Sequence, residues 1–213
     1  MKRSRILIAD DHVVVVEGLR RMLDRSGLEV VGVAKDGRAL VQAASEKRPD
    51  VIITDIAMPL LNGVDAAREI HRQNRKAKII FLTMHPEVAY ATAAFAAGAS
   101  GYVLKSAAGE ELIEAIRSVL NGHTYISRSI AKSVEKAREI KHTNTGSAQD
   151  LLTHRQREIL QLLAEGRQVK EIAGLLKLSP KTVEFHKYRI MSVLGLRTVA
   201  GLARHAQKLG MVE

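Results

Sequence analysis

The 213-residue sequence contains no cysteine and no tryptophan, and only 3% of its residues are aromatic. Without cysteine the chain has no disulfide framework and no thiolate metal site, which is typical of a reducing compartment. The apolar run behind the basic N-terminus ends at Asp10, too early for a signal peptide, and no segment approaches the length of a membrane span. We therefore expect a soluble, cytoplasmic protein with no membrane partner.

Positive charge is concentrated in the C-terminal third of the chain. The formal net charge is +10, of which residues 151–213 contribute +6, while residues 1–125 and 126–150 contribute +2 each. A basic segment of this kind predicts a polyanionic partner. Solubility is the alternative explanation, and the charge by itself does not separate the two.

Short apolar runs alternate with helix-period stretches over the first 120 residues. Runs that are apolar on both faces are typical of strands buried in a parallel sheet. The runs are 6–9, 29–34, 51–54, 78–83 and 101–104, and the helical stretches are 13–24, 37–47, 64–73, 87–97 and 109–121. This alternation predicts an α/β domain with a doubly wound, five-stranded parallel sheet, whose functional groups lie beyond the carboxyl ends of the strands.

The rest of the chain is helical in pattern on both sides of a polar stretch. A helix is predicted at about 128–140, with Ser127 as a candidate cap, and residues 141–150 are interpreted as a flexible linker. Four further helices are predicted at 154–165, 168–176, 180–194 and 198–208. We expect a first domain at 1–123, a linker with a helix at 124–149, and an all-α four-helix domain at 150–213.

Five polar residues follow four strands of the predicted sheet, all at its carboxyl edge: Asp10, Asp11, Asp55, Thr83 and Lys105. Carboxylates crowded together raise one another's pKa, and a hard divalent cation such as Mg²⁺ relieves the repulsion. A lysine ammonium and a threonine hydroxyl are suited to the oxygens of a phosphoryl group, and an aspartate is a competent nucleophile toward phosphorus. The pattern predicts phosphoryl chemistry at this edge.

Each of these residues taken alone has a structural explanation. Asp55 and the Asp10-Asp11 pair are acceptable helix caps, Thr83 is able to satisfy backbone groups at a strand end, and Lys105 is an ordinary solvated lysine. Only their joint placement at successive strand ends favours a functional site.

The motifs Asp10-Asp11, Thr54–Pro59, Leu82-Thr83 and Tyr102–Lys105 resemble, in order and spacing, those of the CheY-like receiver domains of bacterial response regulators. The resemblance covers residues 5–121 and implies that Asp55 is the phosphoacceptor for a sensor histidine kinase. It also implies ligands for Mg²⁺ and a pair of switch residues that act with Lys105, the lysine that pairs with the phosphoryl group. The implied ligands are Asp11, Asp55, the carbonyl of Ala57 and, through water, Asp10; the implied switch pair is Thr83 and Tyr102.

Residues 168–194 have the pattern of two helices joined by a tight polar turn, with Ser179 and Pro180 at the start of the second helix. In that second helix Val183 and Ile190 share one face, which leaves several basic and aromatic side chains on the other. Such a face suits contacts with bases and phosphates in a major groove. The pattern therefore predicts a helix-turn-helix domain.

Residues 150–210 resemble the LuxR-type domain of NarL/FixJ-family regulators, in motifs such as Leu152–Leu160 and Thr182–His186. By that resemblance 180–194 is the recognition helix for a double-stranded DNA promoter. The candidate contact residues are Lys181, Thr182, Glu184, Phe185, Lys187, Tyr188 and Arg189. Glu184 reads a cytosine amine, orients a neighbour or is merely solvated, and for His186 we favour packing over base contact.

The two resemblances together identify the sequence as a response-regulator transcription factor rather than an enzyme, with chemistry limited to phosphorylation and dephosphorylation of Asp55. They imply that the unphosphorylated receiver masks the recognition helix and that phosphorylation promotes a homodimer through the helix at 198–208. An aspartyl-phosphate phosphatase is one alternative, but it usually has a second acid where this chain has Ala57. A ligand-gated LuxR-type regulator is another, although the first domain lacks an aromatic-rich pocket.

Overall fold

The computed structural model describes residues 3–141 and 151–212 and confirms the predicted alternation of strands and helices. The first domain comprises β1 (Arg5–Ala9), α1 (Val13–Arg25), β2 (Glu29–Ala34), α2 (Gly37–Lys47), β3 (Val51–Thr54), α3 (Gly63–Gln73), β4 (Ile79–Thr83), α4 (Val88–Ala96), β5 (Gly101–Leu104), a 3₁₀ turn (Lys105–Ala107), α5 (Ala108–Leu120), β6 (Tyr125–Ile126) and α6 (Arg128–Lys141). Within the described residues, no helix is long and apolar enough to cross a membrane.

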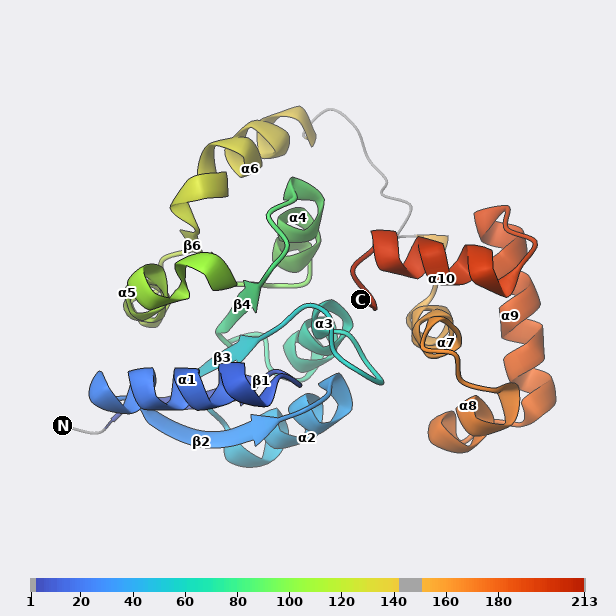
Figure 1. Cartoon of the computed structure of the whole chain (residues 1–213), viewed down its shortest axis with the longest axis horizontal. Helices are drawn as coiled ribbons and strands as arrows, with labels where there is room; N and C mark the ends of the chain where they lie inside the picture. Colours follow the sequence, from blue (N-terminus) through green and yellow to red (C-terminus); the bar gives the residue numbers. More distant parts are fainter. Residues whose placement is uncertain (1–2, 142–150, 213) are drawn as a thin grey trace.

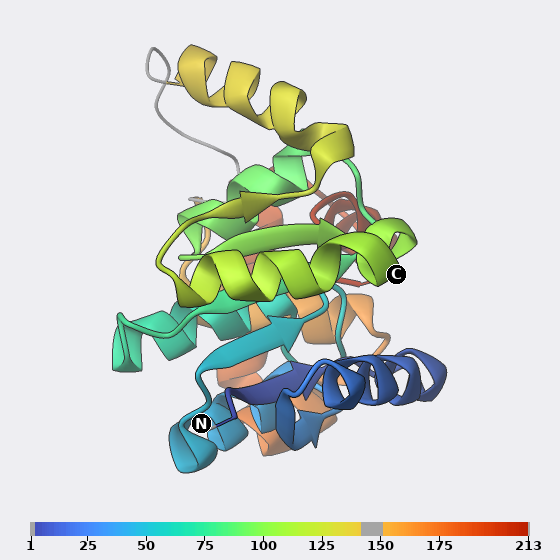
Figure 2. The ribbon, with the colours of Figure 1, turned by 90° about the vertical axis from the view of Figure 1, so that its left-hand side faces the viewer.

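All strands of the sheet are parallel, in the order β2-β1-β3-β4-β5-β6 (Figure 2). Alternate residues of each strand point to opposite faces, so each face has its own core. Ile8 and Ile53 pack against α1 and α5, whereas Leu7, Ile52 and Phe81 pack against α2, α3 and α4. Burial on both faces explains why these strands are continuous apolar runs.

The sheet has a sixth strand where five were predicted. β6 has only two residues and pairs with Gly101 and Tyr102 of β5. A two-residue strand is too short to show a period, so only its tertiary pairing defines it. Ser127, the expected cap, directly precedes α6, and its carbonyl accepts from the N–H of Ala131 over 3.1 Å. Its hydroxyl donates to buried Glu111 of α5 and accepts from the backbone N–H of Leu104.

Helix α6 packs on the first domain rather than standing apart from it. Ile130 and Val134 are buried in the same cluster as Ala91 and Ala94 of α4. The expected start of the linker, Lys141, is the last residue of α6, and residues 142–150 lie outside the described residues. The domain boundaries at residues 123 and 149 stay a prediction. The packing of α6 shows that this helix shares the core of the first domain.

The C-terminal domain has the four predicted helices, α7 (His154–Ala164), α8 (Val169–Leu176), α9 (Pro180–Leu194) and α10 (Val199–Lys208). Thr153 and Gln156 form a capping box, Ser179 and Thr198 cap α9 and α10, and Gly195 ends α9 with φ +65°. These local signals fix the helix boundaries. Ile159, Ile172, Val183, Ile190 and Leu202 form the buried centre of the domain.

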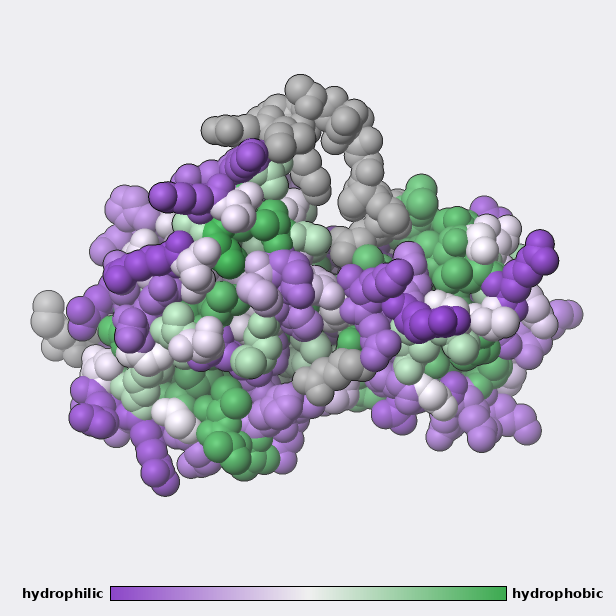
Figure 3. Space-filling model, turned by 45° about the horizontal axis from the view of Figure 1, so that its top comes forward, coloured by the Kyte–Doolittle hydropathy of each residue, from purple (hydrophilic) through white to green (hydrophobic). Residues whose placement is uncertain are grey.

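The two domains are in contact. Figure 1 shows α7 and the end of α10 turned toward the carboxyl edge of the sheet, with α8 and α9 on the far side. Leu60 lies in the loop between β3 and α3, and its side chain packs against the core of the C-terminal domain. Figure 3 shows a largely hydrophilic face with smaller hydrophobic patches on both domains.

Candidate functional site

Three of the predicted residues meet at the carboxyl edge of the sheet. Lys105 Nζ lies 2.8 Å from Asp10 Oδ2 and 2.5 Å from Asp55 Oδ2. The other oxygen of Asp55 accepts a hydrogen bond of 2.6 Å from the backbone N–H of Ile56. Asp10 and Asp55 are both buried, at 2% and 5% exposure. One lysine therefore serves two buried carboxylates that the sequence places 45 residues apart.

The electrostatics of this edge show a deficit of positive charge. Burial raises the pKa of Asp55, and the opposing effect of the Lys105 ammonium does not cancel it. Burial lowers the pKa of Lys105, but its hydrogen bonds to Asp10 and Asp55 outweigh this and leave the pKa raised. The lysine thus stays charged, while Asp55 is still short of compensating charge. An additional cation at this position would stabilise both carboxylates.

The donor set fits the oxygen-loving cation that the sequence predicts. Ligand atoms of Asp10, His12 and Asp55 lie within 4.8 Å of one another. Carboxylate oxygens match the preference of Mg²⁺, whereas the imidazole of His12 does not, and His12 Nδ1 is already 3.1 Å from oxygens of both Asp10 and Asp11. The side chain of Asp11 is 35% exposed and does not belong to this group of three residues. Asp11 and Ala57 together line a neighbouring cavity.

His12 is one residue at this edge that sequence reasoning missed. Its backbone N–H donates to Asp10 Oδ1 over 2.9 Å, and its ring Nδ1 is 3.1 Å from the same oxygen. The hydrogen bond to Asp10 raises the pKa of His12. The available signal was its position directly after the aspartate pair, at the same strand end.

The predicted switch residues lie beside the carboxylates. Thr83 is fully buried at the end of β4 and lines the same cavity as Asp55 and Lys105. Tyr102 is fully buried and donates a 2.7 Å hydrogen bond to the carbonyl of His85, whose own N–H contacts the Thr83 hydroxyl at 3.4 Å. His85 therefore joins the two residues, a link that the sequence did not indicate.

The predicted DNA-contact residues lie on the solvent side of α9. Phe185 and Tyr188 are 60% and 63% exposed, while Val183 and Ile190 on the opposite side are fully buried. The partly or fully exposed set comprises Lys181, Thr182, Glu184, Phe185, Lys187, Tyr188 and Arg189. The Thr182 hydroxyl is within 2.8 Å of the Ser179 hydroxyl, and Lys187 Nζ is 5.6 Å from the centre of the Tyr188 ring. The face is thus basic, aromatic and open.

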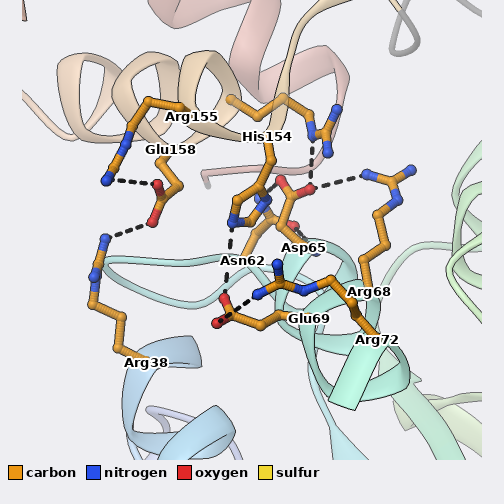
Figure 4. A network of polar contacts seen from close by, with 10 residues as sticks. Arg38, Asn62, Asp65, Arg68, Glu69, Arg72, His154, Arg155 and Glu158 are labelled. Atoms are coloured by element: carbon orange, nitrogen blue, oxygen red, sulfur yellow. Dashed lines mark hydrogen bonds and ion pairs between the residues drawn. The ribbon is translucent and has the colours of Figure 1, made fainter. Parts of the chain in front are cut away.

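The opposite side of the C-terminal domain, on α7, is fixed to the first domain by ion pairs (Figure 4). Arg157 Nε lies 2.7 Å from Asp65 Oδ1, which Arg68 also contacts at 2.9 Å, and Arg38 Nη2 lies 2.7 Å from Glu158 Oε1. Burial raises the pKa of Asp65. The positive charge of Arg157, the hydrogen bond that Asn62 donates and the positive charge of Arg68 together outweigh this effect and hold the pKa below its ordinary value. Sequence reasoning missed this network because its partners come from separate domains.

Asp65→Asn is expected to destabilise the protein at neutral pH by about 1.5–3 kcal/mol, the usual contribution of a hydrogen bond to a charged group. Because the folded-state pKa of Asp65 is depressed, its contribution is present above the ordinary value of 3.8 and is lost as the pH falls through the folded-state value. Urea unfolding of wild type and Asp65→Asn should therefore differ at neutral pH and converge in acid. An equal difference in stability between the two proteins at neutral and at acid pH would exclude the ionisation of Asp65 as the cause.

The contacts between the domains differ from the masking that the family resemblance implies. Among the described residues, hydrogen bonds join α7, the turn after it and the end of α10 to the first domain. The outer face of α9 remains exposed. Helix α9, the predicted recognition helix, is therefore not the element that the first domain covers in this structure.

Comparison with known proteins finds the same two domains. Residues 6–117 match the model of the response regulator receiver domain, and residues 150–206 match that of the bacterial regulatory proteins of the luxR family. The chain is 37% identical to the response regulator UvrY of Escherichia coli over 97% of its length and 94% of that protein, and 37% identical to the response regulator GacA of Pseudomonas aeruginosa over 98% of each chain.

Solved structures give the same result. The RcsB response regulator of Salmonella typhimurium is 30% identical over 98% of this chain and 99% of that chain, with a TM-score of 0.65. A complex of the response regulator RcsB with DNA matches 98% of this chain and 100% of that chain at 29% identity, with a TM-score of 0.60. These relatives are response regulators, and one of the solved structures is a complex with DNA.

Proposed function

This chain belongs to the response regulators that have a receiver domain and a LuxR-type DNA-binding domain, and on that premise we propose that Asp55 is its phosphoacceptor. A sensor histidine kinase is the proposed donor, and a double-stranded DNA promoter is the proposed target. The observation that carries the proposal is the buried convergence of Asp10, Asp55 and Lys105, in which one cation serves two carboxylates.

The side chains have separate roles in the proposed transfer. An oxygen of Asp55 attacks the phosphorus of the donor phosphohistidine, so that an O–P bond forms while the P–N bond breaks and the imidazole leaves with the electron pair. Lys105, already 2.5 Å from Asp55, is placed to contact an oxygen of the transferred group. Thr83 offers its hydroxyl from the same cavity, and Tyr102 follows through His85.

Magnesium is the cofactor proposed for this edge, with Asp11, Asp55 and the Ala57 carbonyl as ligands and Asp10 acting through water. When bound it supplies positive charge that neutralises the phosphoryl oxygens. The raised pKa of Asp55 supports the proposal, because it reflects a carboxylate in need of another cation.

Addition of Mg²⁺ is expected to raise the melting temperature of the wild-type chain. A ligand that binds only the folded state contributes about 2.7 kcal/mol at a hundredfold excess over its dissociation constant. Asp55→Asn removes a charged ligand and should reduce the shift, while Asp24→Asn, an exposed acid of α1, should not. Calorimetry with and without Mg²⁺ measures this, and identical shifts in all three proteins would place the ion elsewhere.

The phosphoacceptor is tested by incubating the full chain with Mg²⁺ and acetyl phosphate. Intact-protein mass spectrometry should show one added phosphoryl group on wild type and none on Asp55→Asn. Peptide mapping then locates the group. Equal labelling of the two proteins would remove Asp55 from the reaction.

DNA binding is proposed to use the exposed face of α9, and phosphorylation is proposed to promote a homodimer through α10. Val199 at the start of α10 and Val193 near the end of α9 are 43% and 40% exposed, so this side has apolar surface to bury. A two-fold dimer of such domains reads paired half-sites.

A further inference from the structure

Ser127, the residue between β6 and α6, is fully buried and binds the end of β5. β6 leads the chain from α5 to α6 at the edge of the sheet (Figure 1). The Ser127 N–H donates to the carbonyl of Tyr102 over 2.8 Å, and the Ser127 hydroxyl accepts from the N–H of Leu104 over 3.2 Å. These two hydrogen bonds hold β5 as far as the residue before Lys105.

The carbonyl of Ser127 belongs to α6 rather than to the sheet. It accepts from the N–H of Ile130 over 3.0 Å and from that of Ala131 over 3.1 Å. If the parallel pair of β5 and β6 continued, this carbonyl would accept from Leu104 instead. The hydroxyl takes its place, so the helix begins and the sheet still binds the Leu104 amide at the same residue.

Glu111, in the first turn of α5, fixes the orientation of the Ser127 hydroxyl. Its side chain is buried, and one carboxylate oxygen accepts from that hydroxyl while the other accepts from the N–H of Arg128 over 3.3 Å. A hydroxyl has a single hydrogen, so donation to Glu111 leaves its lone pairs for Leu104. The carboxylate also lies at the N-terminal ends of α5 and α6, where the helix dipoles favour negative charge.

The residue after Leu104 is Lys105, whose side chain crosses the acidic edge. Its Nζ lies 2.8 Å from Asp10 and 2.5 Å from Asp55, while its backbone begins the 3₁₀ turn. Ser106 follows, exposed to solvent and without a ring to fix its φ, so the turn depends on β5 for its position. A shift of the Leu104 backbone therefore moves the base of the lysine side chain relative to both carboxylates.

We propose that Ser127 and Glu111 are positioning residues for phosphoryl transfer to Asp55. By holding the Leu104 amide, they place Lys105 where its ammonium contacts the transferred group. The inference rests on the proposed role of Asp55. With acetyl phosphate as donor, an oxygen of Asp55 bonds to phosphorus while the bond between phosphorus and the acetate oxygen breaks, and acetate leaves with the electron pair. Lys105 stabilises the charge on the phosphoryl oxygens, which requires its position to be fixed before the reaction.

Ser127→Ala tests the proposal, because it removes the hydroxyl from both the Leu104 N–H and the Glu111 carboxylate. The full chain is incubated with Mg²⁺ and acetyl phosphate at a temperature where circular dichroism shows it to be folded, and intact-protein mass spectrometry gives the initial rate of phosphorylation. We expect this rate to fall about tenfold, less than the hundredfold that a misplacement of about 1 Å can cost. Ser127→Thr keeps the hydroxyl and should phosphorylate within about threefold of the wild-type rate.

Ser100→Ala is the matched control, directly before β5 at its other end. Ser100 binds the neighbouring strands through its backbone, donating to the carbonyl of Ile79 over 2.7 Å and accepting from the N–H of Tyr125 over 3.1 Å. The substitution keeps both hydrogen bonds, so the control should phosphorylate at the wild-type rate. A wild-type rate in Ser127→Ala would overturn the proposal even if that variant melted at a lower temperature. An equal loss in both variants would also contradict it, because any change along β5 would then slow the transfer.

Glu111→Gln tests the second positioning residue at nearly constant volume. The amide has one acceptor oxygen in place of two, so it does not accept from both the Ser127 hydroxyl and the Arg128 N–H in the present arrangement. We expect the initial rate to fall about threefold or more. Glu110→Gln, at the exposed neighbouring position, makes the same change of charge and should leave the rate unchanged. Equal rates in the two variants would remove Glu111 from the proposal.

A double-mutant cycle with Lys105→Ala shows whether Ser127 acts through the lysine. In the Lys105→Ala background, followed over longer times, addition of Ser127→Ala should change the rate by less than about twofold, because the group that it positions is gone. The same tenfold loss in both backgrounds would assign Ser127 a general structural role and overturn the proposal. Wild type that stays unmodified, or that is labelled no more than Asp55→Asn, overturns the role of Asp55 itself, a result distinct from any failure of the Ser127 variants.

Discussion

Gly63→Ala is expected to destabilise the receiver domain by about 3 kcal/mol or more, at the upper end of what overpacking usually costs. The added methyl carbon would lie 1.9 Å from the Asp55 carbonyl oxygen and 3.2 Å from the Thr54 hydroxyl. The nearest of these is backbone, so a rotamer change does not relieve the clash. The start of α3 must move, which also disturbs the hydrogen bond from Gly63 to Ile56 and the cap at Asn62. Urea unfolding followed by circular dichroism measures the loss.

Gly109→Ala on α5 is the matched control. A Cβ there meets nothing within 4 Å, and alanine is the better helix former by about 1 kcal/mol. This variant should be slightly more stable than wild type. If Gly63→Ala unfolded at the same urea concentration as the control, the close approach of the start of α3 to the Asp55 backbone would be wrong.

Replacement of Lys181, Lys187 and Arg189 together by alanine is expected to lower affinity for duplex DNA by roughly a hundredfold to a thousandfold. Hydrogen bonds between charged groups contribute about 1.5–3 kcal/mol each when fully formed, and exposed contacts lie at or below the lower end. Each phosphate neutralised adds about 0.9 to the salt dependence, so the slope of log K against log salt should flatten by up to about 2.7. Fluorescence anisotropy with a labelled non-specific duplex at several salt concentrations measures both.

The control removes the same charge from the other domain, at Arg20, Arg21 and Arg25 of α1. These three side chains are exposed, like those of α9, but lie on the receiver. Their loss should change the affinity for DNA by less than a few-fold, because charges that do not contact the DNA act on it only over distances at which salt screens them. A comparable loss in both triple variants would assign binding to net charge rather than to α9.

Much of the candidate site was predictable from the sequence because it lies at strand ends. Asp10, Asp55 and Lys105 each follow a buried apolar run, and the parallel arrangement places such ends along one edge. The exposed face of α9 was predictable for a similar reason: Val183 and Ile190 must be buried, so Phe185 and Tyr188 point away. His12 was missed because its imidazole joins the aspartates only through side-chain placement, which no period encodes.

The sequence by itself determined the alternation of strands and helices, their capped boundaries and the composition of the acidic edge, because these depend on neighbours within a few residues along the chain. Only the tertiary structure decided which surface of the DNA-binding domain meets the receiver. Gln161 binds Asn62 and Met58 from 99 and 103 residues away, and β6 exists only by pairing with β5. Such contacts depend on the shape and polar complementarity of surfaces that folding has already formed, and these properties have no local pattern.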